Sequence, residues 1–286
     1  MGTSASNTGP NNKSPLLPPW AEQGTPIEIE AGGGDQGGDD NQQTPDKAEV
    51  DNGKVQQQIL GSKPDIPSAN RLAGARKLFG DNAKSGSSKA GLKSSLKRYS
   101  KSSGGGSGTS RRLASGITAG SGLLGIMQGD SVTSKGRTLS LSNLSGLSTD
   151  QVIDRIAEHL TPENGDADAV RLALDFALAE VLPEDEAFDA SMFDGDVVQE
   201  AISNYLTDLI FQDVVNGMGK AWFHVEHPST HHKIEEEIRD LVKVITDSKL
   251  DNLMRDNVGK ISQENIIQIQ IDVISQTVNE WENFDD

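Results

Sequence analysis

The chain has 286 residues, of which 34% are hydrophobic, and it carries a net charge of −17; so little apolar surface cannot offset the conformational entropy of ordering the whole chain. It contains no cysteine, which excludes a disulfide framework, a thiolate zinc site and a cysteine nucleophile. Residues 1–19 have neither the basic start nor the apolar run of a signal peptide. The longest uncharged stretch, residues 113–129, is too short to span a bilayer. We therefore expect a cytoplasmic protein of which only part is folded.

Residues 1–68 are expected to form a disordered N-terminal arm. A glycine-rich stretch at residues 31–38 and frequent prolines oppose helix formation throughout it. Near its start, two adjacent prolines, which favour an extended polyproline II conformation, separate two leucines from a tryptophan. Such a segment displays apolar side chains for a groove on another protein at little entropic cost; the alternative is an apolar tail without a partner. The residues of this docking motif are Leu16, Leu17, Pro18, Pro19 and Trp20.

Residues 69–112 are expected to be a flexible basic segment, in which residues 68–79 could form a short helix on binding a partner. Between Arg71 and Arg112 there are 11 lysines or arginines and a single acid, Asp81, and residues 103–110 consist of glycine, serine and threonine, as in a flexible linker. Such a segment could hold nucleic-acid phosphates in a salt-sensitive, sequence-independent way, or it could hold an acidic protein. Only Phe79 and Tyr99 could stack on bases. The cations singled out for this contact are Lys97, Arg98, Arg111 and Arg112.

Residues 113–147 are expected to connect this segment to a folded domain, first as small residues and then as a leucine- and serine-rich strand or strap. From Asp150 onward there are 31 acids against 9 lysines or arginines, and apolar residues recur at helical spacing. Ser148 and Gln151 form a capping box, and Asp166 is expected to cap the next helix. We therefore predict an all-α protein, with a small, acidic C-terminal helical bundle at residues 148–286 preceded by the long disordered arm. Its helices are expected at residues 148–160, 167–182, 195–216, 231–247, 248–257 and from 262 onward.

Motifs for catalysis or metal binding are weak in this sequence. Four of the five histidines fall within residues 224–232, but Pro228 breaks any helix there, so the imidazoles need not share one face. The acidic loop at residues 184–196 matches only part of a calcium-binding loop, and neither a phosphate-binding loop nor a nucleophile elbow occurs. We therefore expect a non-enzymatic protein with no catalytic residue, no metal site and no cofactor. A metal-dependent hydrolase centred on the histidines is the least favoured alternative.

The N-terminal tip is the most specific local feature. Gly2 follows Met1, so removal of the methionine would expose an unhindered glycine amine. The small residues behind it could enter a narrow active site. The same pattern matches an N-myristoylation signal, but one acyl chain alone binds membranes only marginally. We expect Gly2 to be a modification site, followed by the partner-binding residues Thr3, Ser4, Ala5, Ser6, Gly9 and Pro10 and by the docking motif.

The order of these features resembles the QatB family of the bacterial Qat anti-phage defence system. The resemblance rests on the start at Met1–Ser6, on Gly9 and Pro10, on the docking motif and on residues 111–127. It implies three partners: a P-loop ATPase, a QueC-like enzyme and a TatD-like nuclease. QueC enzymes activate the carboxylate of a 7-deazaguanine acid with ATP, and a QueC-like relative could pass the activated acyl group to an amine.

From this resemblance we predict a non-enzymatic defence component. Its Gly2 would be conjugated to a 7-deazaguanine-type nucleobase by the QueC-like partner, with residues 3–20 as the recognition tail and the helical domain as the docking body. The alternative is a nucleic-acid-binding adaptor, in which residues 71–112 bring the nuclease or the ATPase to DNA.

Overall fold

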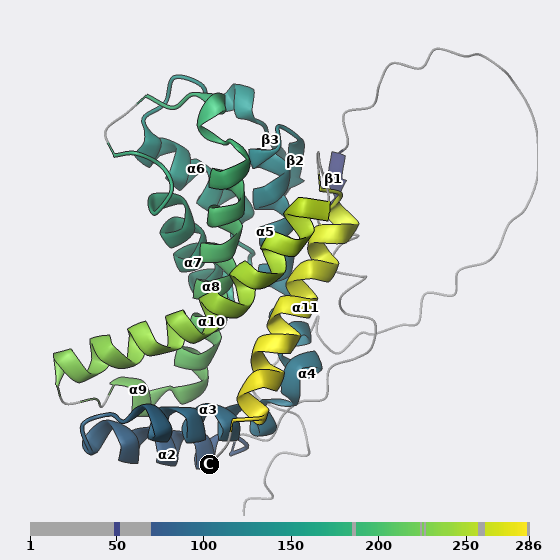
Figure 1. Cartoon of the computed structure of the whole chain (residues 1–286). Coiled ribbons are helices and arrows are strands. Elements are labelled where there is room, and N and C mark those ends of the chain that lie inside the picture. Colours follow the sequence, from purple (N-terminus) through teal and green to yellow (C-terminus); the bar gives the residue numbers. More distant parts are fainter. Residues whose placement is uncertain are drawn as a thin grey trace, which may run out of the picture. The chain divides into compact units, whose positions relative to one another are not determined.

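The computed structural model (Figure 1) describes residues 49–51, 70–184, 187–223, 225, 227–256 and 261–284, and all of these belong to one compact unit, Asp46–Asp286. Within them the protein is all-α apart from three short strands, as predicted. Most of the expected arm, including Gly2 and the docking motif, lies outside the described residues. The helices are α2 (Ala73–Lys84), α3 (Lys89–Ser103), α4 (Gly105–Arg112), α5 (Ala114–Met127), α6 (Thr149–Leu160), α7 (Ala167–Ala179), α8 (Gly195–Met218), α9 (Lys220–Phe223), α10 (Pro228–Asp256) and α11 (Gln263–Glu282), with 3-10 turns at Leu141–Asn143 and Ala190–Met192.

Local capping explains where several helices begin. The Ser148 hydroxyl accepts a hydrogen bond from the backbone N–H of Gln151, and the Gln151 side chain closes the capping box, so α6 begins as predicted. Asp194 and Ser262 cap α8 and α11 through their side-chain oxygens. Asp166 occupies the N-cap position of α7, as predicted, although its side chain makes no capping hydrogen bond.

The helix α10 is continuous over 29 residues, whereas the sequence predicts two helices, at 231–247 and 248–257. It begins at Pro228, which was expected to break any helix. Proline is tolerated at the first position of a helix because its missing N–H would have no intrahelical partner there. Farther along, Leu250 is buried in the core, and this burial carries the helix past the expected break.

Residues 69–112 were expected to be flexible, and this prediction is wrong, because they contain α2, α3 and α4. Their small residues permit close packing: a Cβ built on Gly106 of α4 would lie 2.6 Å from the carbonyl oxygen of Ser275 in α11. The hydroxyls of Ser110 and Ser275 are joined by a hydrogen bond of 3.0 Å. Residues that resemble a linker in the sequence therefore let two helix backbones approach each other closely.

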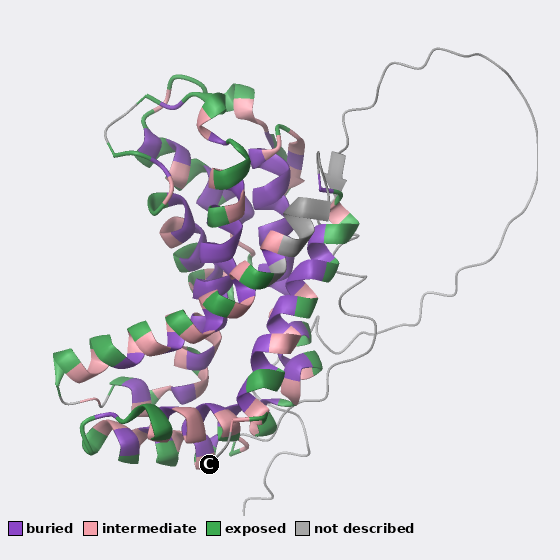
Figure 2. Cartoon of the chain, viewed as in Figure 1, coloured by how far each residue is buried: buried purple, intermediate pink, exposed green. Residues whose placement is uncertain are grey.

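The expected connecting segment at 113–147 also contributes to the core. All 14 residues of α5 are buried (Figure 2). Its glycines admit neighbouring side chains, since a Cβ on Gly116 would lie 2.6 Å from Leu209 of α8, and a Cβ on Gly120 would lie 2.2 Å from Gln270 of α11. α5 is therefore a central helix of the protein and not a connection.

The strand expected after α5 is part of a β-hairpin. β2 (Ser131–Ser134) pairs antiparallel with β3 (Arg137–Leu139), and β1 (Glu49–Asp51) pairs parallel with β2. The loop residues Lys135 and Gly136 both have positive φ, 51° and 70°, as in the tight turns that match the twist of a hairpin.

Two apolar clusters form the core, and long helices join them. The first contains α5, α6, α7 and the hairpin, and the second contains Phe79, Tyr99, Trp222 and Trp281 from α2, α3, α9 and α11. α8 and α11 contribute to both clusters. Because α2 packs on α8 and α9, and α3 and α4 pack on α11 (Figure 1), the acidic residues 148–286 share one core with the basic helices.

Candidate functional site

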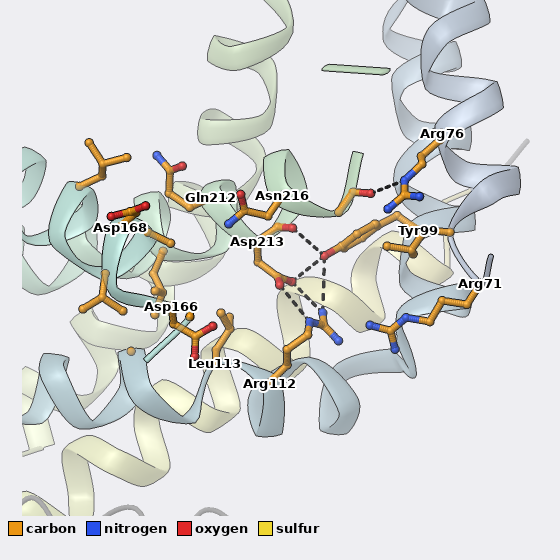
Figure 3. A pocket seen from close by; sticks show the side chains of 18 residues that line it. Arg71, Arg76, Tyr99, Arg112, Leu113, Asp166, Asp168, Gln212, Asp213 and Asn216 are labelled. Atoms are coloured by element: carbon orange, nitrogen blue, oxygen red, sulfur yellow. Dashed lines mark hydrogen bonds and ion pairs between the residues drawn. The ribbon is translucent and has the colours of Figure 1, made fainter. Parts of the chain in front are cut away.

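A cavity of about 460 Å³ lies where the basic helices meet α7 and α8, and this volume falls within the usual range of small-ligand sites. Its walls come from the turn before α2, from α2, α3 and α4, from the start of α5 and α7, and from the second half of α8. No histidine, serine or lysine is among its lining residues in the described chain. Six charged side chains line it (Figure 3): Arg71, Arg76, Arg112, Asp166, Asp168 and Asp213.

A hydrogen-bonded cluster forms one wall of the cavity and joins α3, α4 and α8. Arg112 donates from Nε to Asp213 Oδ1 at 2.9 Å and from Nη2 to Asp213 Oδ2 at 2.7 Å, a bidentate pair that is stronger than a single neutral hydrogen bond. The Tyr99 hydroxyl donates to Asp213 Oδ2 at 2.6 Å. Arg112 also donates from Nη1 to the carbonyl oxygen of Ser103 at 3.0 Å. The side chain of Asp213 is only 10% exposed, so this cluster fixes three helices at one point.

The electrostatics of the cluster keep its proton donors protonated. Burial raises the pKa of Tyr99 well above its ordinary value, and the negative charge of Asp213 raises it further. Burial alone would lower the pKa of Arg112, but the hydrogen bonds and charge of Asp213 outweigh that effect and raise it. Neither group therefore loses its proton near neutral pH, and the cluster is suited to holding a fixed charge pattern and not to proton transfer.

The remaining charges lie on opposite sides of this cluster. Arg76 donates from Nε to the carbonyl oxygen of Gly217 at 2.8 Å, and Arg71 lies on the same side (Figure 3). Asp166 and Asp168, at the start of α7, are exposed and lie on the other side (Figure 3). The cavity thus presents positive groups on one wall and negative groups on the other, which suits a ligand or peptide segment that carries both charges.

The four cations singled out from the sequence have different environments. Lys97 donates from Nζ to the carbonyl oxygen of Phe284 at 2.8 Å. Arg98 and Arg111 are exposed. Arg112 is committed to Asp213 within the cavity wall. The structure therefore brings none of the other three into the cluster that holds Arg112, and the predicted sites from Gly2 to Trp20 lie outside the described residues.

The histidine-rich stretch does not gather metal ligands in the described residues. His231 packs edge-on against Trp222 with the ring centroids 4.5 Å apart, and His232 lies 3.1 Å from Glu236. His227 is exposed, and His224 lies outside the described residues. Within the described part of the chain, no group of three or more potential ligands could hold a metal ion.

Sequence reasoning did not identify Asp213, the residue that organises the cavity wall. Asp213 and Arg112 are 101 residues apart, and no local pattern joins them. The sequence does contain a signal for another buried carboxylate in the same helix. Asp208 lies among the buried apolar residues of α8, between Tyr205 and Leu209. A carboxylate at such a position requires a partner, and Arg239 of α10 provides it.

These features define a class, an all-α protein with a charged cavity in its described residues. In the described residues, no helix has the length and apolar character needed to cross a membrane. The family model described as "Qat anti-phage system associated protein QatB" matches residues 104–280, from the start of α4 to near the end of α11. The chain belongs to the QatB family, and it is therefore a component of an anti-phage defence system. The comparisons with curated proteins and with solved structures each return no match.

Proposed function

We propose that this protein is a non-enzymatic component of a Qat defence complex, and that it binds a QueC-like enzyme and offers Gly2 as the acceptor of a 7-deazaguanine-type nucleobase. The observation that carries the proposal is the family match over residues 104–280, because it makes the chain a component of an anti-phage defence system. The resemblance described above implies that a QueC-like enzyme is another component. We further propose that the complex contains the P-loop ATPase and the TatD-like nuclease, and that it acts in the cytoplasm.

The chemistry of the tip supports Gly2 as the acceptor. After removal of Met1, the amine of Gly2 would attack the carbonyl carbon of a carboxylate that ATP has activated as an adenylate. A carbon–nitrogen amide bond forms, the bond to the adenylate oxygen breaks, and AMP leaves while the amine loses a proton. The small residues Thr3 to Ser6 leave the amine accessible in a narrow active site. Leu16, Leu17 and Trp20 would anchor the tail in an apolar groove of the partner.

The cavity supports a role in binding. Tyr99 and Arg112 keep their protons and brace the wall through Asp213. The other charged lining residues, Arg71, Arg76, Asp166 and Asp168, are suited to positioning a charged segment of a partner. The division of labour that we propose therefore has the partner enzyme performing the chemistry, while this chain supplies the acceptor amine and the docking body.

The test is intact-mass and N-terminal peptide mass spectrometry of the protein, expressed alone and together with the QueC-like enzyme. We expect an added mass of deazaguanine size on Gly2 only in the co-expressed sample. Gly2→Pro, which replaces the primary amine by a hindered secondary one, should lose the modification and phage defence, whereas Gln23→Ala, which lies beyond the recognition tail, should keep both. An unmodified Gly2 in both samples would exclude the conjugation, and the arm would then serve only in docking.

A further inference from the structure

An ordered row of lysines runs along α3. Lys89, Lys93, Lys97 and Lys101 recur every four residues, and residues four apart lie on neighbouring turns of one helix face. With a rise of 1.5 Å per residue, successive lysines are about 6 Å apart along the axis, and the row spans about 18 Å. Lys89 and Lys101 are exposed and the two central lysines are partly buried. We call these four residues the α3 lysine row.

The buried face of α3 lies beside the row. Leu92, Leu96 and Tyr99 are almost fully buried in the core and are centred roughly 110° around the helix from the lysines. Lys93 and Lys97 are therefore partly buried at the margin of a packed helix, and Lys89 and Lys101 are exposed. The positive charge of this region is therefore presented by a rigid surface, unlike the charge of an unfolded segment. A preorganised surface loses less conformational entropy when it binds a ligand.

The charges around the row are strongly positive. Residues 71–112 hold 11 lysines or arginines and one acid, Asp81, and the exposed side chains of Lys84 and Arg98 add to the charge of α2 and α3. Most acids of this chain, whose net charge is −17, belong to residues 150–286. Interactions between exposed charges are largely screened beyond about 8 Å at physiological ionic strength. Of these acids, Glu282 reaches α3 and accepts a hydrogen bond from the Ser100 hydroxyl, so the row is a positive surface with this carboxylate beside it.

The chain already places an oxygen acceptor on this row. Beyond α11, the Phe284 ring centroid lies 4.9 Å from Lys93 Nζ, and the Phe284 carbonyl oxygen accepts a hydrogen bond of 2.8 Å from Lys97 Nζ. Two residues earlier, Glu282 accepts a hydrogen bond from the Ser100 hydroxyl at 2.8 Å. The two central lysines are thus engaged by a segment that carries both an apolar group and oxygen acceptors.

We propose that the α3 lysine row binds the phosphate backbone of double-stranded nucleic acid, and that the Phe284 segment competes with it for Lys93 and Lys97. A linear array of point charges suits a polyanion with regularly spaced phosphates, and it carries no means of recognising individual bases. Single-stranded nucleic acid is usually held by aromatic side chains that stack on bases. The two aromatic residues of α2 and α3, Phe79 and Tyr99, are buried, and this favours a duplex. The inference goes beyond the proposed conjugation of Gly2 and does not depend on it.

The first experiment measures fluorescence anisotropy of a labelled, random-sequence DNA duplex titrated with the full chain. We expect binding that does not depend on sequence and that weakens by about 100-fold between 50 and 200 mM salt, because about four neutralised phosphates give a slope near −3.6 in log K against log salt. The variant K89E/K93E/K97E/K101E should bind at least about 10-fold more weakly at 50 mM salt. If the variant does not fold by circular dichroism, the four Lys→Gln substitutions make the same test.

A matched control separates the row from total charge. K135E/R137E/R155E/K220E changes the net charge by the same amount at exposed positions outside α3, and it should bind almost as well as the parent chain. Equal losses in the two variants would overturn the proposal, and so would tighter binding of a single strand than of the duplex. Binding of polyglutamate with no binding of DNA would assign the row to an acidic protein instead.

The competition has its own test. Truncation after Asn283 removes the segment that contacts Lys93 and Lys97, and we expect duplex affinity to rise several-fold. Phe284→Ala, which removes only the ring over Lys93, should give a smaller increase. Unchanged affinity in the truncated chain would show that the segment does not compete.

Discussion

Two helix–helix interfaces of this protein, called seams below, are packed in opposite ways. In the small-residue seam, α4 meets α11 through Gly106, Ser110 and Ser275, and the backbones approach until a single Cβ would collide. In the polar seam, α8 meets α10 through four side-chain pairs that follow one another along the two helices. These pairs are Gln199 with Asp251, Ser203 with Asp247, Asn204 with Lys243, and Asp208 with Arg239.

The difference between the seams lies in what each requires of its partner. The small-residue seam needs only space, and its few short side chains lose little rotamer entropy on packing. The polar seam depends on its partners most where the side chains are buried, because a buried polar group without a partner is costly. Lys243 and Asp247 are 39% and 45% exposed. Its centre is the most demanding point: the side chain of Asp208 is 1% exposed, and Arg239 lies between the rings of Phe176 and Phe211, 4.6 and 4.1 Å from their centroids.

The largest effect should come from breaking the centre of the polar seam. Arg239→Met removes the charge that compensates Asp208 and the contacts with two aromatic rings, and we expect the free energy of unfolding to fall by about 3–5 kcal/mol. Urea denaturation followed by circular dichroism measures this loss. The double variant Asp208→Leu/Arg239→Met should recover most of it, because no buried charge is left without a partner. A loss below about 1 kcal/mol in the single variant would show that the pair behaves like a surface salt bridge.

A smaller effect is expected from overfilling the small-residue seam. Gly106→Ala places a methyl group 2.6 Å from the Ser275 carbonyl oxygen and 2.7 Å from its Cα, so α4 or α11 must shift, and we expect a loss of about 1–3 kcal/mol. Gly80→Ala in α2 is the matched control, because a Cβ there meets nothing within 4 Å. It should stabilise the protein by about 0.5–1 kcal/mol, since alanine has less backbone freedom in the unfolded chain. Equal effects of the two substitutions, measured by denaturation, would contradict the close approach.

The smallest effect concerns how the free energy of unfolding depends on pH through one buried polar side chain, His159. His159 of α6 is buried and hydrogen-bonded through Nε2 to the carbonyl oxygen of Val132 at 2.9 Å. Burial lowers its pKa below the ordinary value near 6.5. Below that pH the unfolded chain binds a proton that the folded chain resists, so the stabilising contribution is complete above about pH 6.5 and declines as the pH falls.

We expect the free energy of unfolding to fall between pH 7 and pH 5.5, as measured by urea denaturation at each pH. His159→Gln keeps a side-chain donor for the Val132 carbonyl and cannot titrate. Its stability relative to the parent chain should therefore improve as the pH falls, which also cancels the contributions of all other groups. A constant difference between the two proteins across this range would rule out the proton linkage.

Local signals predicted much of the helical framework. The capping box at Ser148 and Gln151 and the helical spacing of apolar residues in α8 and α11 each involve residues close together in sequence, and the helices begin near the expected positions. The predictions failed where the partner is distant. Residues 103–110 have the composition of a linker, and only α11, more than 150 residues away, makes their small side chains useful for packing.

The charged residues of the α3 lysine row and of the cavity show the same difference between local signals and distant contacts. The lysines that form the α3 row are evident in the sequence, but they were expected to be part of a flexible segment, and burial of Leu92, Leu96 and Tyr99 is what orients them. Arg112 was expected to face an external anion, and the structure pairs it with Asp213 instead. Conjugation of Gly2 remains a prediction that mass spectrometry can decide.

The sequence by itself determined the all-α class, the uneven distribution of charge and the resemblance of the tip and of residues 111–127 to the QatB family, because these properties depend on composition and short-range spacing. Only the tertiary structure decided that the basic residues 71–112 share a core with the acidic helices, that α5 lies at its centre, and that a charged cavity forms between them. The physical reason is that the local sequence around a glycine, serine or arginine does not determine whether the residue packs in a core, lies in a flexible linker or binds a partner. Their role depends on whether a distant backbone or carboxylate approaches them, as Ser275 approaches Gly106 and Asp213 approaches Arg112.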